Sequence, residues 1–77
     1  MNYLKGILNK LIGQRDIELS DLNVYINNPV AIGEHANIGE EIEIKISKID
    51  ELNSKIETVN SIIEQIQANF KKQTDTQ

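Results

Sequence analysis

The stretch that decides the fold is IGEEIEIKISKIDELNSKIETVNSIIEQIQANF, residues 38–70. Isoleucine, leucine and valine recur in it at alternating spacings of three and four residues. This heptad pattern, with apolar side chains at its first position a and its fourth position d, is typical of a helix that packs along another helix. Neither proline nor glycine occurs in residues 40–77. The sequence therefore predicts one long, coiled-coil-like helix over residues 38–71.

The heptad repeat is almost complete. Position a is apolar in five heptads out of five and position d in four out of five, with Lys45 as the exception. Positions e and g carry no complementary charges that would select one partner, so the repeat is compatible with a dimer, a trimer or an intramolecular hairpin. We predict that an interface is formed by Ile42, Ile49, Leu52, Ile56, Val59, Ile63 and Ile66.

The start of this helix carries mixed signals. Asn37 is suited to cap it, and Glu40 three residues later completes a pair that resembles a capping box. Residues 41–46, EIEIKI, alternate charged residues with isoleucine in the period of a strand. We prefer the helix because the heptad repeat persists for more than four heptads. Ile46 and Ile62 widen the apolar face at positions e and g, which suggests that another helix packs there.

The N-terminal segment predicts a second helix. Residues 1–13 place Leu4, Ile7, Leu8, Leu11 and Ile12 on one helical face. Gly13 is expected to end this helix. We expect the apolar face to pack on the long helix, with Ile46 or Ile62 among its contacts. The alternative is a peripheral membrane anchor formed by residues 3–12, because Lys5 and Lys10 occupy the polar side.

The middle of the chain predicts a short helix over residues 19–28, although residues 23–26 alone also fit a strand. Because Pro29 disfavours helical backbone at the residue before it, this helix must end by Asn28. Residues 29–37 are rich in turn-forming residues and predict a corner loop. Residues 72–77 contain no apolar side chain and predict a frayed tail.

The corner loop contains the one histidine, His35, and the one proline of the chain. A catalytic role for His35 would need a nucleophile, but no serine is accompanied by an oxyanion motif, and there is no cysteine. The spacing of the acidic residues matches no metal-binding loop. We therefore predict no catalytic residue, no enzyme activity, no metal and no cofactor. A possible docking loop for a partner comprises Tyr25, Pro29, Ile32 and His35.

Size and charge limit the possible functions. A single domain of 77 residues has a core that supplies only about 3–5 kcal/mol, so association with a partner is expected. Residues 1–15 carry a charge of +3 and residues 16–43 a charge of −7. This balance disfavours nucleic-acid binding, because the acidic middle of the chain repels phosphate. No apolar run reaches the length of a membrane span, and we expect a cytoplasmic protein.

The segment DLNVYINNPVAIGEH, residues 21–35, followed by a charged isoleucine-rich helix, resembles a recurring segment in small uncharacterised proteins of large contractile-tailed bacteriophages. The resemblance covers roughly residues 19–60. It implies a phage accessory or virion-associated protein, located in the cytoplasm of a host bacterium or in the virion. The family supplies no activity or site residue to transfer.

Together these patterns predict an all-α protein in which short N-terminal helices fold by a turn onto one long helix, as a single small domain. We predict that it is a non-enzymatic interaction or assembly module, a homo-oligomer or the partner of another helical protein. Membrane binding through residues 3–12 and weak nucleic-acid binding are the alternatives.

Overall fold

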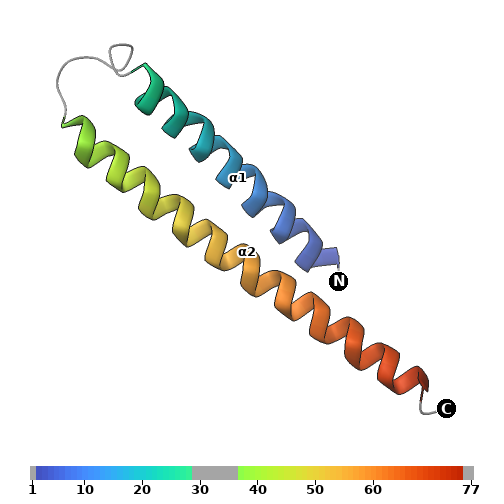
Figure 1. Cartoon of the computed structure of the whole chain (residues 1–77). Helices are drawn as coiled ribbons and strands as arrows, with labels where there is room; N and C mark the ends of the chain where they lie inside the picture. The colour runs from blue at the N-terminus through green and yellow to red at the C-terminus, as the bar shows by residue number, and fades with distance from the viewer. Residues whose placement is uncertain (1, 29–36, 76–77) are drawn as a thin grey trace.

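Two antiparallel α-helices make up the part of the chain that the structure describes (Figure 1). The computed structural model describes residues 2–28 and 37–75, and within them α1 spans Asn2–Asn27 and α2 spans Ile38–Asp75. No strand occurs in these two ranges. The predicted all-α class is confirmed, and the two helices pack along each other as a helical hairpin.

The predicted break at Gly13 is wrong, because α1 continues from Asn2 to Asn27 without interruption. The separate helices over residues 1–13 and 19–28 are one element. A glycine inside a helix is unfavourable by about 1 kcal/mol relative to alanine, but it is not forbidden. The burial pattern of α1 continues in one heptad register on both sides of Gly13, so packing against α2 offsets this penalty. The side chains that face α2 are Leu4, Leu8, Leu11, Arg15, Glu18, Leu22 and Tyr25.

The N-terminus of α2 is capped as the sequence predicts. The Asn37 side-chain Oδ1 accepts a hydrogen bond from the backbone N–H of Glu40 at 3.2 Å. The Asn37 carbonyl accepts one from the backbone N–H of Glu41 at 3.0 Å. The side-chain bond satisfies a donor that has no partner within the helix, and the carbonyl bond is the first regular bond of α2. Glu40 and Glu41 favour the positive end of the helix dipole. Residues 41–46 are helical, so the heptad repeat prevails over the alternating pattern.

The C-terminus of α2 differs from the prediction. The helix continues to Asp75, so residues 72–75 are not a frayed tail. Lys71 and Lys72 are good helix formers, and Lys72 lies in the last turn, where a cation favours the negative end of the helix dipole. The helix therefore extends without any apolar side chain in its last turn.

A narrow apolar core joins the two helices. It consists of one buried residue of α1 and a heptad row of α2, namely Leu11, Leu52, Ile56, Val59 and Ile63. The half-buried Leu4, Leu8 and Ile12 of α1 pack against this core. Leu52 is the most enclosed of them, with 2% of its surface exposed. The expectation that Ile46 or Ile62 receives α1 is wrong, because both are exposed and the a and d positions of α2 make this contact instead.

The hairpin is a rod. Its extents are 66 × 17 × 17 Å and its radius of gyration is 18.3 Å, whereas a compact domain of this length has a radius of gyration of roughly 11 Å. Two helices laid side by side cover each other on one face only, so most of the surface of each helix stays accessible. No helix in the described ranges has the length and apolar character needed to cross a membrane.

Candidate protein-interaction surface

The predicted interface row lies mainly inside the hairpin. Ile49, Leu52, Ile56, Val59 and Ile63 are buried. Ile42 is half-buried and Ile66 is exposed. Helix α1 of the same chain thus covers most of this row. The side chains accessible to another protein are those that α1 and α2 leave uncovered.

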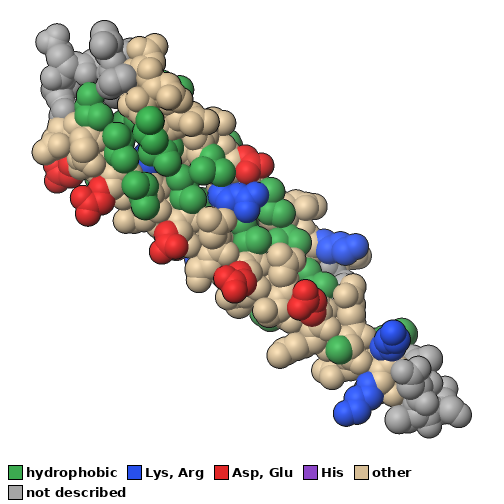
Figure 2. All heavy atoms as spheres, in the orientation of Figure 1, with side chains coloured by type: hydrophobic (Ala, Val, Ile, Leu, Met, Phe, Trp, Pro, Cys, Tyr) green, Lys and Arg blue, Asp and Glu red, His purple; other side chains and the backbone are tan. Residues whose placement is uncertain are grey.

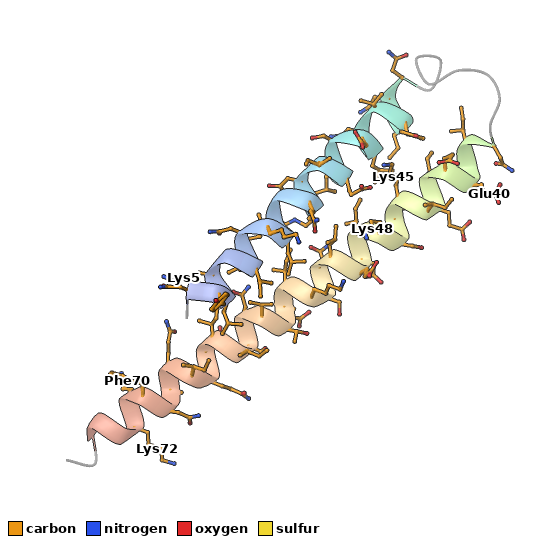
Figure 3. The ribbon with its side chains drawn as sticks, turned by 180° about the vertical axis from the view of Figure 1, so that it is seen from behind. Lys5, Glu40, Lys45, Lys48, Phe70 and Lys72 are labelled. Carbon is orange, nitrogen blue, oxygen red and sulfur yellow. The ribbon has the colours of Figure 1, made fainter. Side chains whose placement is uncertain are left out.

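An ionic cluster interrupts the apolar core near the loop end of the hairpin. Lys45 occupies the one d position of α2 that is not apolar, and it lies between the two helices (Figure 3). Its Nζ donates hydrogen bonds to Glu18 Oε2 at 3.1 Å and to Asp21 Oδ2 at 3.2 Å. The same ammonium group lies 5.9 Å from the centre of the Tyr25 ring, within cation–π range.

The cluster stabilises the charged form of Lys45. The hydrogen bond to Glu18 is the main cause that raises the pKa of Lys45 above its usual value of 10.5, and Asp21 contributes in the same direction. The Lys45 side chain is only 19% exposed, so the two carboxylates replace much of the water that an ammonium group needs. A polar group at a single core position fixes the register of paired helices.

A second polar contact crosses the helices nearer to the middle of the rod. Arg15 Nη1 donates a hydrogen bond to Asn53 Oδ1 at 3.3 Å, and Arg15 Nη2 lies 3.4 Å from Asp16 Oδ1. Arg15 therefore points toward the flank of the hairpin that carries Asp16. With the Lys45 contacts, this pairing sets the alignment of the two antiparallel helices.

More large hydrophobic side chains are exposed than buried in the described residues. Six are buried, while eleven others are exposed: Tyr3, Ile7, Ile17, Leu19, Val24, Ile26, Ile44, Ile46, Ile62, Ile66 and Phe70. Figure 2 shows hydrophobic side chains gathered along one face of the rod, with acidic side chains spaced along α2. Exposed apolar surface of this extent marks an interaction site more often than a solvated face.

Four of these exposed residues belong to one row on α1, here named the outer row. Each residue of the outer row comes one position before an α2-facing residue. The outer row is therefore rotated by about 100° around the axis of α1 from the α2-facing row. It repeats with heptad spacing and consists of Tyr3, Ile7, Lys10, Gln14, Ile17, Asp21 and Val24. Helix α1 therefore has two rows with the spacing of a helix-packing surface, and α2 covers only one of them.

The open end of the rod also presents apolar side chains. A shallow depression of about 400 Å³ is lined by Tyr3, Gly6 and Ile7 together with Asn2 and Lys10. Gly6 leaves open space where a side chain would stand. Beyond this point α2 extends past the start of α1, and Phe70 and Lys72 lie on the extension (Figure 3).

The possible docking loop is only partly described. Tyr25 is half-buried and lies beside Lys45 in the ionic cluster. Pro29, Ile32 and His35 lie outside the described residues. In the described ranges no group of three or more acidic or histidine side chains is arranged to hold a metal ion.

The outer row is not predicted from the sequence, because the first helix is expected to end at Gly13. The signal is nevertheless present, since the spacing of the row continues unbroken from Tyr3 to Val24. A helix that is assumed to end at residue 13 contains only the first three members of the row, which are too few to reveal a heptad.

Comparison with protein-family models, with curated proteins and with solved structures finds no match to this chain.

Proposed function

We propose that this protein is a non-enzymatic interaction or assembly module that binds another protein surface through the apolar side chains on the outside of its helical hairpin. The observation that carries the proposal is the excess of exposed over buried large hydrophobic residues in the described ranges. Burying such side chains against a partner is favourable by about 25 cal/mol per Å² of apolar surface.

The architecture supports an assembly role. A two-helix hairpin has a core only one row of side chains wide, and isolated hairpins of this kind gain stability when further helices pack on them. The rod is long and straight enough to offer two flanks to partners, and each flank carries isoleucine. An enclosed pocket for a small substrate would need concave walls, whereas the depression lined by Tyr3, Gly6 and Ile7 is shallow and lies on the outside of α1.

The interface residues predicted from the sequence keep a role in this proposal, but an indirect one. The buried members of the row hold α1 in place on α2. Ile66 is exposed and Ile42 is half-buried, and they extend the apolar surface toward the two ends of the rod. The buried row thus builds the module, and the exposed side chains bind its partner.

The resemblance of residues 19–60 to small proteins of contractile-tailed phages gives the proposal its biological setting. In this setting the chain is an accessory or virion-associated protein, and it acts in the bacterial cytoplasm or in the virion. An assembly module of this kind would contact a helical protein or a further copy of itself.

The two alternatives have less support. In residues 3–12, Leu4, Leu8 and Leu11 face α2, so the face suited to a membrane surface is occupied by the hairpin. For nucleic-acid binding, Arg15 is engaged with Asn53 and Asp16. Salt-dependent retention on DNA or binding to anionic vesicles would favour these alternatives.

The test compares two variants of the full chain with the native protein. One variant carries glutamine in place of four exposed isoleucines, Ile7, Ile17, Ile44 and Ile46. The matched control carries glutamine in place of four exposed serines on the outward sides of the helices, Ser20, Ser47, Ser54 and Ser61. Both should keep the helical circular dichroism of the native chain.

We expect association, measured by sedimentation and by cross-linking in the native source, to be lost in the isoleucine variant and retained in the serine variant. Equal association of both variants would overturn the proposal, because binding would then not depend on the apolar surface.

A further inference from the structure

One flank of the hairpin carries exposed aliphatic side chains beside a row of carboxylates. This flank comprises the residues that come one position after a core-facing residue, on α1 and on α2 alike. Arg15 contacts two of them, Asp16 on α1 and Asn53 on α2. The two helices therefore present these residues on the same side of the rod, which is named the Asp16 flank here.

An apolar strip runs along the Asp16 flank where the two helices adjoin. It consists of four aliphatic residues: Ile12, Leu19, Ile26 and Ile46. Ile12 is half-buried, whereas the side chains of Leu19, Ile26 and Ile46 are 41%, 56% and 52% exposed. At the helical rise of about 1.5 Å per residue, the strip is about 21 Å long from Ile12 to Ile26.

Three carboxylates border the strip on α2. Glu43, Asp50 and Glu57 recur every seven residues, so they lie about 10 Å apart along the helix, and Glu64 continues the row. Glu43 and Asp50 are three and four residues from Ile46, which makes them its neighbours on the helix surface. All these carboxylates are exposed. Figure 2 shows acidic side chains spaced along α2 beside hydrophobic ones.

The hairpin does not neutralise this row of carboxylates. Among the described residues, ion pairs join Arg15 to Asp16, Lys45 to Glu18 and Asp21, and Lys48 and Lys55 to Glu51. None of these pairs includes a carboxylate of the row. A partner that carries the opposite charge at the same spacing would therefore complement the flank.

We infer that the Asp16 flank binds an amphipathic helix of another protein, whose aliphatic seam covers the strip and whose lysine or arginine side chains, repeated every seven residues, meet Glu43, Asp50 and Glu57. This inference rests on the proposed function and names the partner by its chemistry. The bound helix lies along both α1 and α2, so the product is a three-helix bundle. A helix of about three heptads is long enough to cover the strip.

The strip and the carboxylates contribute in different ways. Covering the aliphatic side chains supplies the attraction. The carboxylates raise the rate of association and select the partner more than they raise the affinity, and salt weakens their effect. A helix with acidic residues at the same positions would place like charges opposite Asp50 and Glu57 and would be rejected.

A second copy of this chain is less suited to the Asp16 flank. The lysines of the chain that are seven residues apart are Lys48 and Lys55. Both already contact Glu51, at 3.7 and 3.3 Å. A second copy would therefore bring a carboxylate together with its two lysines, whereas a helix with uncompensated cations matches the row.

The first experiment uses two synthetic peptides of about three heptads, each with isoleucine and leucine in its seam. One peptide has lysine at the positions that flank the seam, and the other has glutamate there. The like charges keep each peptide from pairing with itself. Binding of the labelled peptides to the full chain is measured by fluorescence anisotropy.

We expect the lysine peptide to bind at least about tenfold more tightly than the glutamate peptide, with an affinity that falls as salt is added. Equal binding of the two peptides would overturn the inference. A lysine peptide that does not bind at a chain concentration of about 1 mM would overturn it too.

The second experiment compares two double variants that remove the same charge. Asp50→Asn with Glu57→Gln changes the row on the Asp16 flank. Glu41→Gln with Glu51→Gln is the control, because both residues come one position before a core-facing residue and lie on the opposite flank. We expect the dissociation constant of the lysine peptide to rise at least about fivefold in the first variant and less than about twofold in the control. Equal effects would show attraction to net charge alone and refute the inference.

A matched pair on α1 tests the strip. Leu19→Gln changes the strip, and Ile17→Gln, two residues away, changes the outer row on the opposite flank. Both variants should retain the circular dichroism of the native hairpin. We expect Leu19→Gln to raise the dissociation constant of the lysine peptide at least about fivefold and Ile17→Gln to raise it less than about twofold. The reverse ranking would assign the peptide to the outer row and not to the Asp16 flank.

Two outcomes separate this inference from the proposed function. If association in the native source is lost in the isoleucine variant above but retained in Asp50→Asn with Glu57→Gln, the inference fails and the proposed function stands. If the native chain associates with itself and this double variant abolishes that association, the Asp16 flank binds a second copy, and the inference fails as well.

Discussion

At the scale of single residues, Lys45 has the most specific role in the hairpin. It is the one charged residue at the core positions of α2, and it meets two carboxylates of α1. The sequence shows that Lys45 breaks the apolar repeat but does not show which acids it meets, because the partners depend on how α1 is aligned with α2. With a predicted break at Gly13, the register of Glu18 and Asp21 relative to the long helix could not be derived from the sequence.

The raised pKa of Lys45 predicts a loss of stability at high pH. A group with a raised pKa in the folded state contributes stability that is complete below its unfolded pKa, near 10.5. That contribution is lost as the pH rises through the folded value. We expect the melting temperature of the native chain to be constant relative to that of Lys45→Met at lower pH, and to fall relative to it once the pH rises above 10.5.

The control for this titration is Lys5→Met, which removes a lysine outside the cluster. Its melting temperature should follow that of the native chain over the same range. If the difference between the native chain and Lys45→Met stays constant with pH, the ammonium group does not stabilise the fold.

Leu52 is the residue whose truncation should be most damaging. Its side chain is almost completely enclosed, and replacing a buried leucine by alanine costs about 2–5 kcal/mol. A hairpin of this size has only a few kcal/mol of stability, so Leu52→Ala should be largely unfolded in thermal circular dichroism measurements. Ile44→Ala, which shortens an exposed side chain, should melt within a few degrees of the native chain.

At the scale of the elements, α1 shows that packing outweighs local propensity. Gly6 and Gly13 both lie within this helix, and a Cβ atom built on either meets nothing within 4 Å. Their positions face outward, away from α2. The sequence predicted the helical type of this segment, but its continuity depends on α2, which lies far along the chain.

Gly13→Ala should stabilise the hairpin. The added methyl group has open space, and alanine in a helix interior is favoured over glycine by about 0.5–1 kcal/mol. Chemical denaturation should show an increase of this size in the free energy of unfolding. No change, or a decrease, would indicate that α1 is not helical through residue 13 in solution.

Asn37 should contribute through its cap at the start of α2. Asn37→Ala removes the acceptor for the Glu40 N–H, and such a loss costs typically about 1 kcal/mol. Asn37→Asp keeps an acceptor at the cap and should restore the native value in the same denaturation experiment. Equal destabilisation by both variants would argue against a role for the side-chain oxygen.

At the scale of the whole molecule, the thin core links stability to association. Any partner that binds the folded hairpin and not the unfolded chain raises the apparent stability by mass action. If the partner is a second copy, the melting temperature of the native chain should rise with protein concentration, and Ile17→Asp should lack this dependence. A native melting temperature that is independent of concentration up to the high micromolar range would contradict self-association.

The sequence predicts the helical class and the long helix well, because a heptad repeat that persists for more than four heptads leaves few alternatives. It predicts the surface poorly. The heptad correctly places Ile56 in the covered row, but the expectation that Ile46 or Ile62 also receives α1 is wrong. The burial of the a and d positions and the cross-helix contacts of Lys45 and Arg15 identify the covered row.

Two helices that pack only through aliphatic side chains can slide along each other at little cost in free energy. A displacement of one heptad, about 10 Å, would preserve most apolar contacts. In one direction, however, it would carry Lys45 to the enclosed place that Leu52 now occupies, and it would leave Glu18 without its cation. The ion pairs of Lys45 therefore oppose sliding and fix the length of the rod. In any lattice built from such rods, this ammonium group would set the repeat distance.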